Sequence, residues 1–238
     1  MERVYLEEVD STNKWAKENL AGLKNMSVVY TYKQTAGRGR LDRKWNYNGA
    51  GNIYASIVIK HKGSMKDVYS NLTQYLSLII SEVIEEYNVK PFIKWPNDIK
   101  VDGKKIAGIL AEAVIEDDST SIILGFGVNL NCKREDMDRI DKPATSLNLV
   151  AGMEIDKEHF FQRVLDKFCL GYDNFIGEGF QSIRDEYKNK AEFLNREITV
   201  KVFDKSVYGI AKDVTENGAL RIVGNKGDEH ILYMGDII

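Results

Sequence analysis

The sequence has few of the residues that build disulfide frameworks and metal centres. Its 238 residues include only two cysteines and three histidines. Cys132 falls in a predicted loop and Cys169 on the apolar face of a predicted helix, so the sequence predicts two free thiols and suggests neither a disulfide framework nor a zinc cluster. His61, His159 and His230 have neither metal-ligand spacing nor a plausible nucleophile partner, which argues against a hydrolase triad.

The sequence also lacks long apolar runs and a strong excess of one charge. No apolar run approaches the ~20 residues of a membrane span, and the N-terminal MERVYLEEVD is too acidic for a signal peptide. With 43% hydrophobic residues and a net charge of −3, we expect a cytoplasmic globular protein with one good-sized core and a small second domain. The balanced charge argues against a nucleic-acid binder, because such proteins usually carry a broad basic face.

The most distinctive stretch is residues 33–45, KQTAGRGRLDRKW, here called the basic loop. Gly37 and Gly39 allow the main chain to approach a ligand, while Arg38 and Arg40 offer planar, permanently charged groups to phosphate or carboxylate oxygens. The spacing matches neither a Walker loop nor the dinucleotide fingerprint. The loop predicts a site for a small polyanion; taken alone, a solvated basic connection or a nucleic-acid patch is an equally good interpretation.

Hydrophobic periodicity predicts an α+β fold with a mixed sheet flanked by helices. The expected strands are residues 4–6, 27–34, 52–60, 92–98, 99–101, 106–114 and 121–129. The expected helices begin at Asp10 or Ser11, at Ser64, within 143–150 and at Asp156. Four short strands then follow, at 198–203, 207–214, 219–223 and 230–233, with a tight turn at Asn217–Gly218. We therefore expect a first domain over 1–187 and a small antiparallel barrel over 188–238.

Four further motifs accompany the basic loop. They are VDSTN at 9–13, KWPND at 94–98, GKKIAGILAE at 103–112 and GFGVNLN at 125–131. In this order the set resembles the catalytic module of biotin protein ligases, which join biotin to a lysine of carboxylase carrier proteins. The resemblance covers nearly the whole chain. It implies a class II synthetase-like biotin–lipoate ligase catalytic domain with a C-terminal SH3-like barrel.

The resemblance also implies substrates and partners. ATP and biotin are the expected substrates, with Mg²⁺, and biotinyl-5'-AMP is the expected intermediate. The expected partner is the biotin carboxyl carrier protein domain of a biotin-dependent carboxylase. No helix-turn-helix unit precedes the STN segment, so the resemblance is to the form without a DNA-binding domain, and we expect neither DNA nor a membrane as a partner. A homodimer is left open.

The resemblance assigns site residues by their match to the family motifs. Three residues are assigned to catalysis: Lys105 near the α-phosphate, Arg38 facing carboxylate and phosphate, and Asp98 as a magnesium ligand or as the base for the acceptor lysine. The biotin-binding set is Ser11, Thr12, Asn13, Gln34, Gly37, Arg38, Lys105, Gly108, Leu110 and Gly125. The ATP-binding set is Arg38, Gly39, Arg40, Trp45, Lys94, Asn97, Lys105 and Asn129.

Two other functions are considered. Lipoate ligases and octanoyl transferases are distant relatives with the same fold and chemistry, but GRGR with KWPND and a terminal barrel is typical of the biotin branch. A non-catalytic nucleic-acid binder would use the basic loop alone. Leu41 and Asp42 follow GRGR where other family members continue with arginine and glycine, and this bears on how tightly the loop closes on the adenylate.

Overall fold

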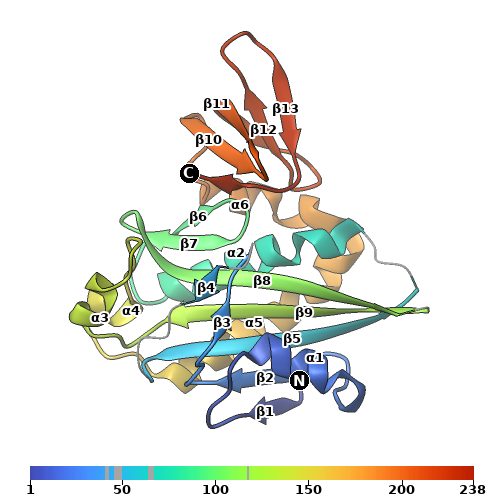
Figure 1. Ribbon diagram of the computed structural model, residues 1–238, viewed down its shortest axis with the longest axis vertical. Coiled ribbons are helices and arrows are strands. Elements are labelled where there is room, and N and C mark those ends of the chain that lie inside the picture. Colours follow the sequence, from blue (N-terminus) through green and yellow to red (C-terminus); the bar gives the residue numbers. More distant parts are fainter. Residues whose placement is uncertain (41–42, 46–49, 64–66, 117) are drawn as a thin grey trace.

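A seven-stranded mixed sheet forms the centre of the molecule (Figure 1). The computed structural model describes residues 1–40, 43–45, 50–63, 67–116 and 118–238. The strand order is β1-β2-β5-β9-β8-β7-β6, where β1 pairs parallel with β2 and the other neighbours pair antiparallel. The strands are β1 (Arg3–Tyr5), β2 (Val28–Thr31), β5 (Asn52–Lys62), β6 (Phe92–Lys94), β7 (Asp98–Val101), β8 (Lys104–Glu116) and β9 (Ser119–Asn129).

Helices cover both faces of this sheet because the apolar residues of its central strands alternate. On β5, Ile53 and Ile57 point into the main core, which includes apolar residues of α2 (Leu72–Glu85) and α5 (Lys157–Glu178). Val58 points the other way and joins a smaller cluster with Ala16 of α1 (Thr12–Glu18). The expected sheet flanked by helices is confirmed.

Capping residues explain where two helices begin. The Ser11 hydroxyl accepts the Lys14 N–H at the start of α1, and the Asp156 carboxylate accepts the His159 N–H at the start of α5. The helix expected to begin at Ser64 begins later in the chain. Ser64 lies outside the described residues, Asp67–Asn71 forms the 3-10 turn η2, and α2 begins at Leu72. The shorter elements are η1 (Leu20–Gly22), α3 (Arg134–Asp138), α4 (Leu147–Ala151), η3 (Gly179–Ile183) and α6 (Arg184–Asn189).

A five-stranded antiparallel sheet follows α6 and forms the small terminal barrel, drawn in orange and red in Figure 1. Its strands are β10 (Glu197–Val202), β11 (Lys205–Val214), β12 (Leu220–Val223), β13 (Glu229–Leu232) and β14 (Asp236–Ile237). The four strands predicted from the sequence are present. The sequence did not predict β14, because a two-residue strand carries no periodicity.

The segment leading into and through the basic loop differs from expectation. The strand predicted for 27–34 ends at Thr31, because the Lys33 N–H is bonded to the Thr31 hydroxyl rather than to a neighbouring strand. Gln34 pairs only through an isolated parallel bridge to Val9. The basic loop itself contains an antiparallel ribbon of β3 (Gly37–Arg38) and β4 (Lys44–Trp45), while Leu41 and Asp42 lie outside the described residues.

Among the helices of the described residues, none has the length and apolar character needed to cross a membrane.

Candidate functional site

A cavity of about 780 Å³ lies between the central sheet, the β3–β4 ribbon and the end of the barrel. It collects residues from separate parts of the chain, from Ser11 near the N-terminus to Ile238 at the C-terminus. Every residue that the sequence assigns to the site lines it, except Gly37. Gly37 lies just behind the lining, where a Cβ atom would be 2.5 Å from Gln34 Nε2 and 2.9 Å from Trp45 Cβ.

One end of the cavity is a polar wall lined by Thr12, Asn13 and Gln34, with Ser56 bonded to it from behind. The Thr12 N–H donates to Gln34 Oε1 at 2.9 Å. The Ser56 hydroxyl lies 2.8 Å from Thr12 Oγ1 and 2.6 Å from Asn13 Oδ1. All four side chains are buried. The wall therefore holds small hydroxyl and amide groups in fixed directions, as recognition of a neutral polar ring requires.

Glu112 supports this wall from β8 and is a residue the sequence analysis missed. Asn13 Nδ2 donates to its carboxylate at 2.8 Å, Lys17 Nζ lies 2.5 Å away, and the Arg38 guanidinium lies 3.8 Å away. Burial alone would raise the pKa of Glu112, but the bonds from Lys17 and Asn13 and the charge of Arg38 lower it below its usual value. Its place at the end of the GKKIAGILAE motif was the only signal in the sequence.

Glycines form the floor of the cavity, where they accommodate protein side chains. A Cβ atom on Gly125 would lie 2.0 Å from Asn13 Oδ1. A Cβ atom on Gly108 would lie 2.8 Å from both Lys105 Nζ and a ring carbon of Trp45. A Cβ atom on Gly127 would lie 3.1 Å from the same indole ring. These strands thus need glycine so that Asn13 and Trp45 can lie flat against the sheet.

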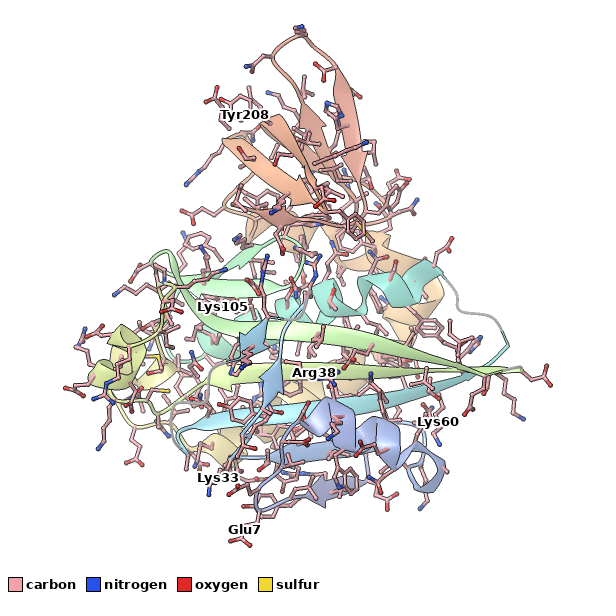
Figure 2. The ribbon with its side chains drawn as sticks, in the orientation of Figure 1. Glu7, Lys33, Arg38, Lys60, Lys105 and Tyr208 are labelled. Carbon is pink, nitrogen blue, oxygen red and sulfur yellow. The ribbon has the colours of Figure 1, made fainter. Side chains whose placement is uncertain are left out.

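The other end of the cavity carries the charged groups. Lys105 Nζ lies 2.6 Å from Asp98 Oδ1 and 5.0 Å from the centre of the Trp45 ring. Asn97 donates to the carbonyl of Ile109 and accepts a bond of 3.2 Å from Arg40. Figure 2 shows Lys105 closer to the barrel than Arg38 is.

Lys94 and Lys100 add to this positive end, together with Lys142 of the loop after α3. Burial lowers the pKa of Lys94, and the charge of Lys100 lowers it further. An ammonium group in this position is stabilised by any anion that enters the cavity. The sequence assigned Lys94 to the site but missed Lys100 and Lys142, which have no motif of their own.

The barrel contributes directly to the cavity through its last strand. Asp236 of β14 lies 2.7 Å from Arg43 and 3.6 Å from Arg40, so it connects the barrel to the basic loop. Ile237 and Ile238 also line the cavity. No sequence signal pointed to these three residues, because they are almost two hundred positions from the loop.

Family models match both parts of the chain. The model of the biotin/lipoate A/B protein ligase family matches residues 5–129. The model of the biotin protein ligase C-terminal domain matches residues 193–238. The chain belongs to the biotin/lipoate A/B protein ligase family.

Curated and solved members of the family resemble the chain over almost its full length. The bifunctional ligase/repressor BirA of Bacillus subtilis is 32% identical, and the match covers 98% of this chain and 73% of that protein. A biotin–[acetyl-CoA-carboxylase] ligase of Paracoccus denitrificans is 28% identical over 95% of this chain and 96% of its own. The biotin protein ligase of Aquifex aeolicus in complex with biotin and ATP superposes with a TM-score of 0.80 at 26% identity, covering 100% of this chain and 97% of that one.

The side chains that line the cavity suit a metal ion that binds together with a substrate better than a metal ion that the protein holds permanently. Among the described residues, no group of three or more His, Cys, Asp or Glu side chains could hold an ion. Asp98 is a carboxylate at the charged end of the cavity. Mg²⁺ commonly takes one or two carboxylates and completes its shell with water and substrate phosphates, and Asp98 fits that pattern.

Proposed function

We propose that the chain is an ATP-dependent ligase that activates biotin as biotinyl-5'-AMP and transfers it to a lysine of a biotin carboxyl carrier protein. The observation that carries this proposal is that one cavity has a fixed polar wall at one end and a cluster of cations at the other. The family membership and the likeness to ligases solved with biotin and ATP support the same reaction.

In the first step the biotin carboxylate attacks the α-phosphorus of ATP. An oxygen–phosphorus bond forms, the bond to the bridging oxygen breaks, and pyrophosphate leaves. Negative charge grows on the α-phosphate oxygens in the transition state, so fixed cations accelerate the step. Lys105 is the proposed principal cation, and Arg38 and Arg40 are proposed to hold the carboxylate and the phosphates. Mg²⁺, with Asp98 as its candidate protein ligand, would neutralise phosphate charge when bound.

In the second step the acceptor lysine attacks the carbonyl carbon of the adenylate. The new amide bond forms, the carbon–oxygen bond to phosphate breaks, and AMP leaves with the electron pair. The amine must lose a proton, and Asp98, a carboxylate in the cavity, is the proposed acceptor as the alternative to its role as magnesium ligand. No protein nucleophile is needed, which agrees with the histidine pattern in the sequence.

We assign the remaining residues by their place in the cavity. Ser11, Thr12, Asn13, Gln34, Gly37, Gly108, Leu110 and Gly125 are proposed for biotin. Gly39, Trp45, Lys94, Asn97 and Asn129 are proposed for ATP, with the Trp45 indole available to stack on the base. We also propose the division into a catalytic domain over 1–187 and a barrel over 188–238.

Biotin-dependent exchange of labelled pyrophosphate into ATP tests the first step. The proposal predicts exchange with biotin and little with lipoate or octanoate under the same conditions. The relatives from Paracoccus denitrificans and Aquifex aeolicus are named as biotin ligases, which favours biotin over lipoate. Exchange driven by lipoate instead of biotin would contradict the proposed substrate.

A further inference from the structure

The turn between β11 and β12 reaches from the barrel to the first domain. The Gly218 N–H closes the turn by donating to the Thr215 carbonyl at 2.9 Å. Gly218 has a φ of 75°, and a Cβ atom there would lie 2.3 Å from Asn71 Nδ2 and 2.6 Å from Gln74 Oε1. Glycine is therefore required both by the backbone conformation and by the close approach to the start of α2.

Three side-chain donors from the first domain converge on the two carbonyls of this turn. Asn71 Nδ2 donates to the Asn217 carbonyl at 3.0 Å. Gln74 Nε2 and Trp95 Nε1 donate to the Gly218 carbonyl at 2.9 and 3.1 Å. The donors are buried, with Trp95 only 2% exposed. Water cannot readily replace these bonds, so they fix the indole relative to the barrel.

Trp95 belongs to the KWPND segment that supplies the charged end of the cavity. Lys94 precedes it, and Asn97 and Asp98 follow within three residues. Asn97 bonds Arg40, and Asp98 pairs with Lys105. The segment touches the end of the first domain as well, since the Tyr187 hydroxyl donates to the Pro96 carbonyl at 3.3 Å.

The polar wall has a different support. Its hydrogen bonds join α1, Gln34, β5 and β8, and none of these elements contributes a donor to the Asn217–Gly218 turn. A change at the turn should therefore act directly on residues 94–98 and reach the polar wall only through β8, which Asn97 bonds at Ile109.

We propose that Trp95 and Gly218 are positioning residues, through which the barrel sets the geometry of residues 94–98 at the end of the cavity that takes the nucleotide. This inference rests on the proposed function for the identity of that ligand. It makes the barrel a determinant of nucleotide affinity and predicts a smaller effect of the turn on the affinity for biotin.

Two variants remove one donor each and keep the fold. Trp95→Phe removes the indole N–H and keeps an aromatic ring in the core, and the Gly218 carbonyl still accepts the bond from Gln74. Gln74→Leu removes the other donor, together with the acceptor of the 2.7 Å bond from Asn71 Nδ2. We expect each variant to bind α,β-methylene ATP roughly fivefold more weakly, the effect of one lost hydrogen bond. We expect the dissociation constant for biotin to stay within about twofold of the unmodified chain.

Asp213→Asn is the matched control. It removes the ion pairs that join the barrel to Arg184 and Lys188, at 2.6 and 2.7 Å, and leaves the turn intact. We expect unchanged affinity for the ATP analogue. The inference is overturned if Trp95→Phe and Gln74→Leu bind the analogue normally, if both ligands weaken equally, or if Asp213→Asn weakens the analogue to the same degree.

Titration calorimetry measures the binding of α,β-methylene ATP and does not depend on turnover. The proposed ligase function and the proposed role of the turn can therefore be contradicted independently. Absence of biotin-dependent pyrophosphate exchange in the unmodified chain would contradict the ligase function. The affinity for the analogue still decides whether the turn positions residues 94–98.

Discussion

Lys105 lies where the carboxylate of Asp98, the Trp45 indole and the glycine floor meet. We predict that Lys105→Ala lowers the rate of adenylate formation by about 100- to 1000-fold, because a preorganised charge is lost from the transition state. The fold should survive, since the side chain lies in the cavity and outside the core. Pyrophosphate exchange measures the effect. Lys104→Ala, on the exposed neighbouring residue, is the control, and near-normal exchange in Lys105→Ala would rule out the assignment.

Arg38 and Arg40 are two positions apart but meet different partners. Arg40 contacts Asn97 at the charged end of the cavity, whereas Arg38 lies near Glu112 beside the polar wall. We predict that Arg40→Gly releases the adenylate about tenfold faster, the loss of a charge-assisted phosphate contact, while biotin affinity changes less. Labelled biotin appearing on unrelated lysines in a protein mixture would report the release. Arg38→Gly serves as the comparison, and the prediction fails if Arg40→Gly weakens biotin binding without increasing release.

The contribution of Glu112 to the stability of the protein depends on pH. Its pKa in the folded protein is lower than the ordinary value of 4.5, so its contribution to stability is fully present above pH 4.5 and is lost as the pH falls through the folded pKa. We predict that the difference in unfolding free energy between the unmodified chain and Glu112→Gln is greatest near neutral pH and shrinks below pH 4.5. Denaturant titrations at several pH values measure it. Glu116→Gln, at the exposed end of β8, is the control, and a pH-independent difference would refute this role.

At the scale of elements, the β3–β4 ribbon is attached to the barrel by Asp236. The Arg43–Asp236 pair is partly exposed, so it contributes only about 0.2 to 1 kcal/mol. We predict that Asp236→Ala increases amide hydrogen exchange in the ribbon by roughly two- to fivefold in the ligand-free protein. Asp228→Ala is the control, because Asp228 pairs with His230 within the barrel. Unchanged exchange in the ribbon of Asp236→Ala would show that the ion pair does not hold it.

Most elements were predictable because each is encoded locally. Alternation identified β5, and the capping signals at Asp10 or Ser11 and at Asp156 identified the starts of α1 and α5. The ribbon inside the basic loop was not predictable, since its pairing depends on Gly37 fitting against Gln34 and Trp45.

The site was predictable only where residues fall in motifs. The assigned motif residues except Gly37 line one cavity, whereas Ser56 and Asp236, which lie outside the motifs, were missed, as was Glu112 at the end of its motif. Ser56 lies inside an apolar strand and Asp236 lies in the terminal barrel, so their roles depend on three-dimensional contacts. Chain order alone does not encode such contacts.

At the scale of the whole molecule, the cavity brings two chemically different ends together on one sheet. The polar wall is held by α1, β5 and β8, and the cationic end is held by residues 94–98 and the barrel. This division allows a neutral ring and a polyphosphate to be bound by separate parts of the chain while their reacting groups meet between them.

Transfer of biotin to a purified biotin carboxyl carrier domain tests the central claim most directly. The account predicts that incubation with biotin, ATP and Mg²⁺ attaches one biotin to the carrier lysine, detected as the corresponding mass increase. Omission of ATP or replacement of that lysine by arginine should abolish the product. A folded chain that binds biotin and ATP but leaves the intact carrier unmodified, or that modifies it equally well with lipoate, would contradict the account.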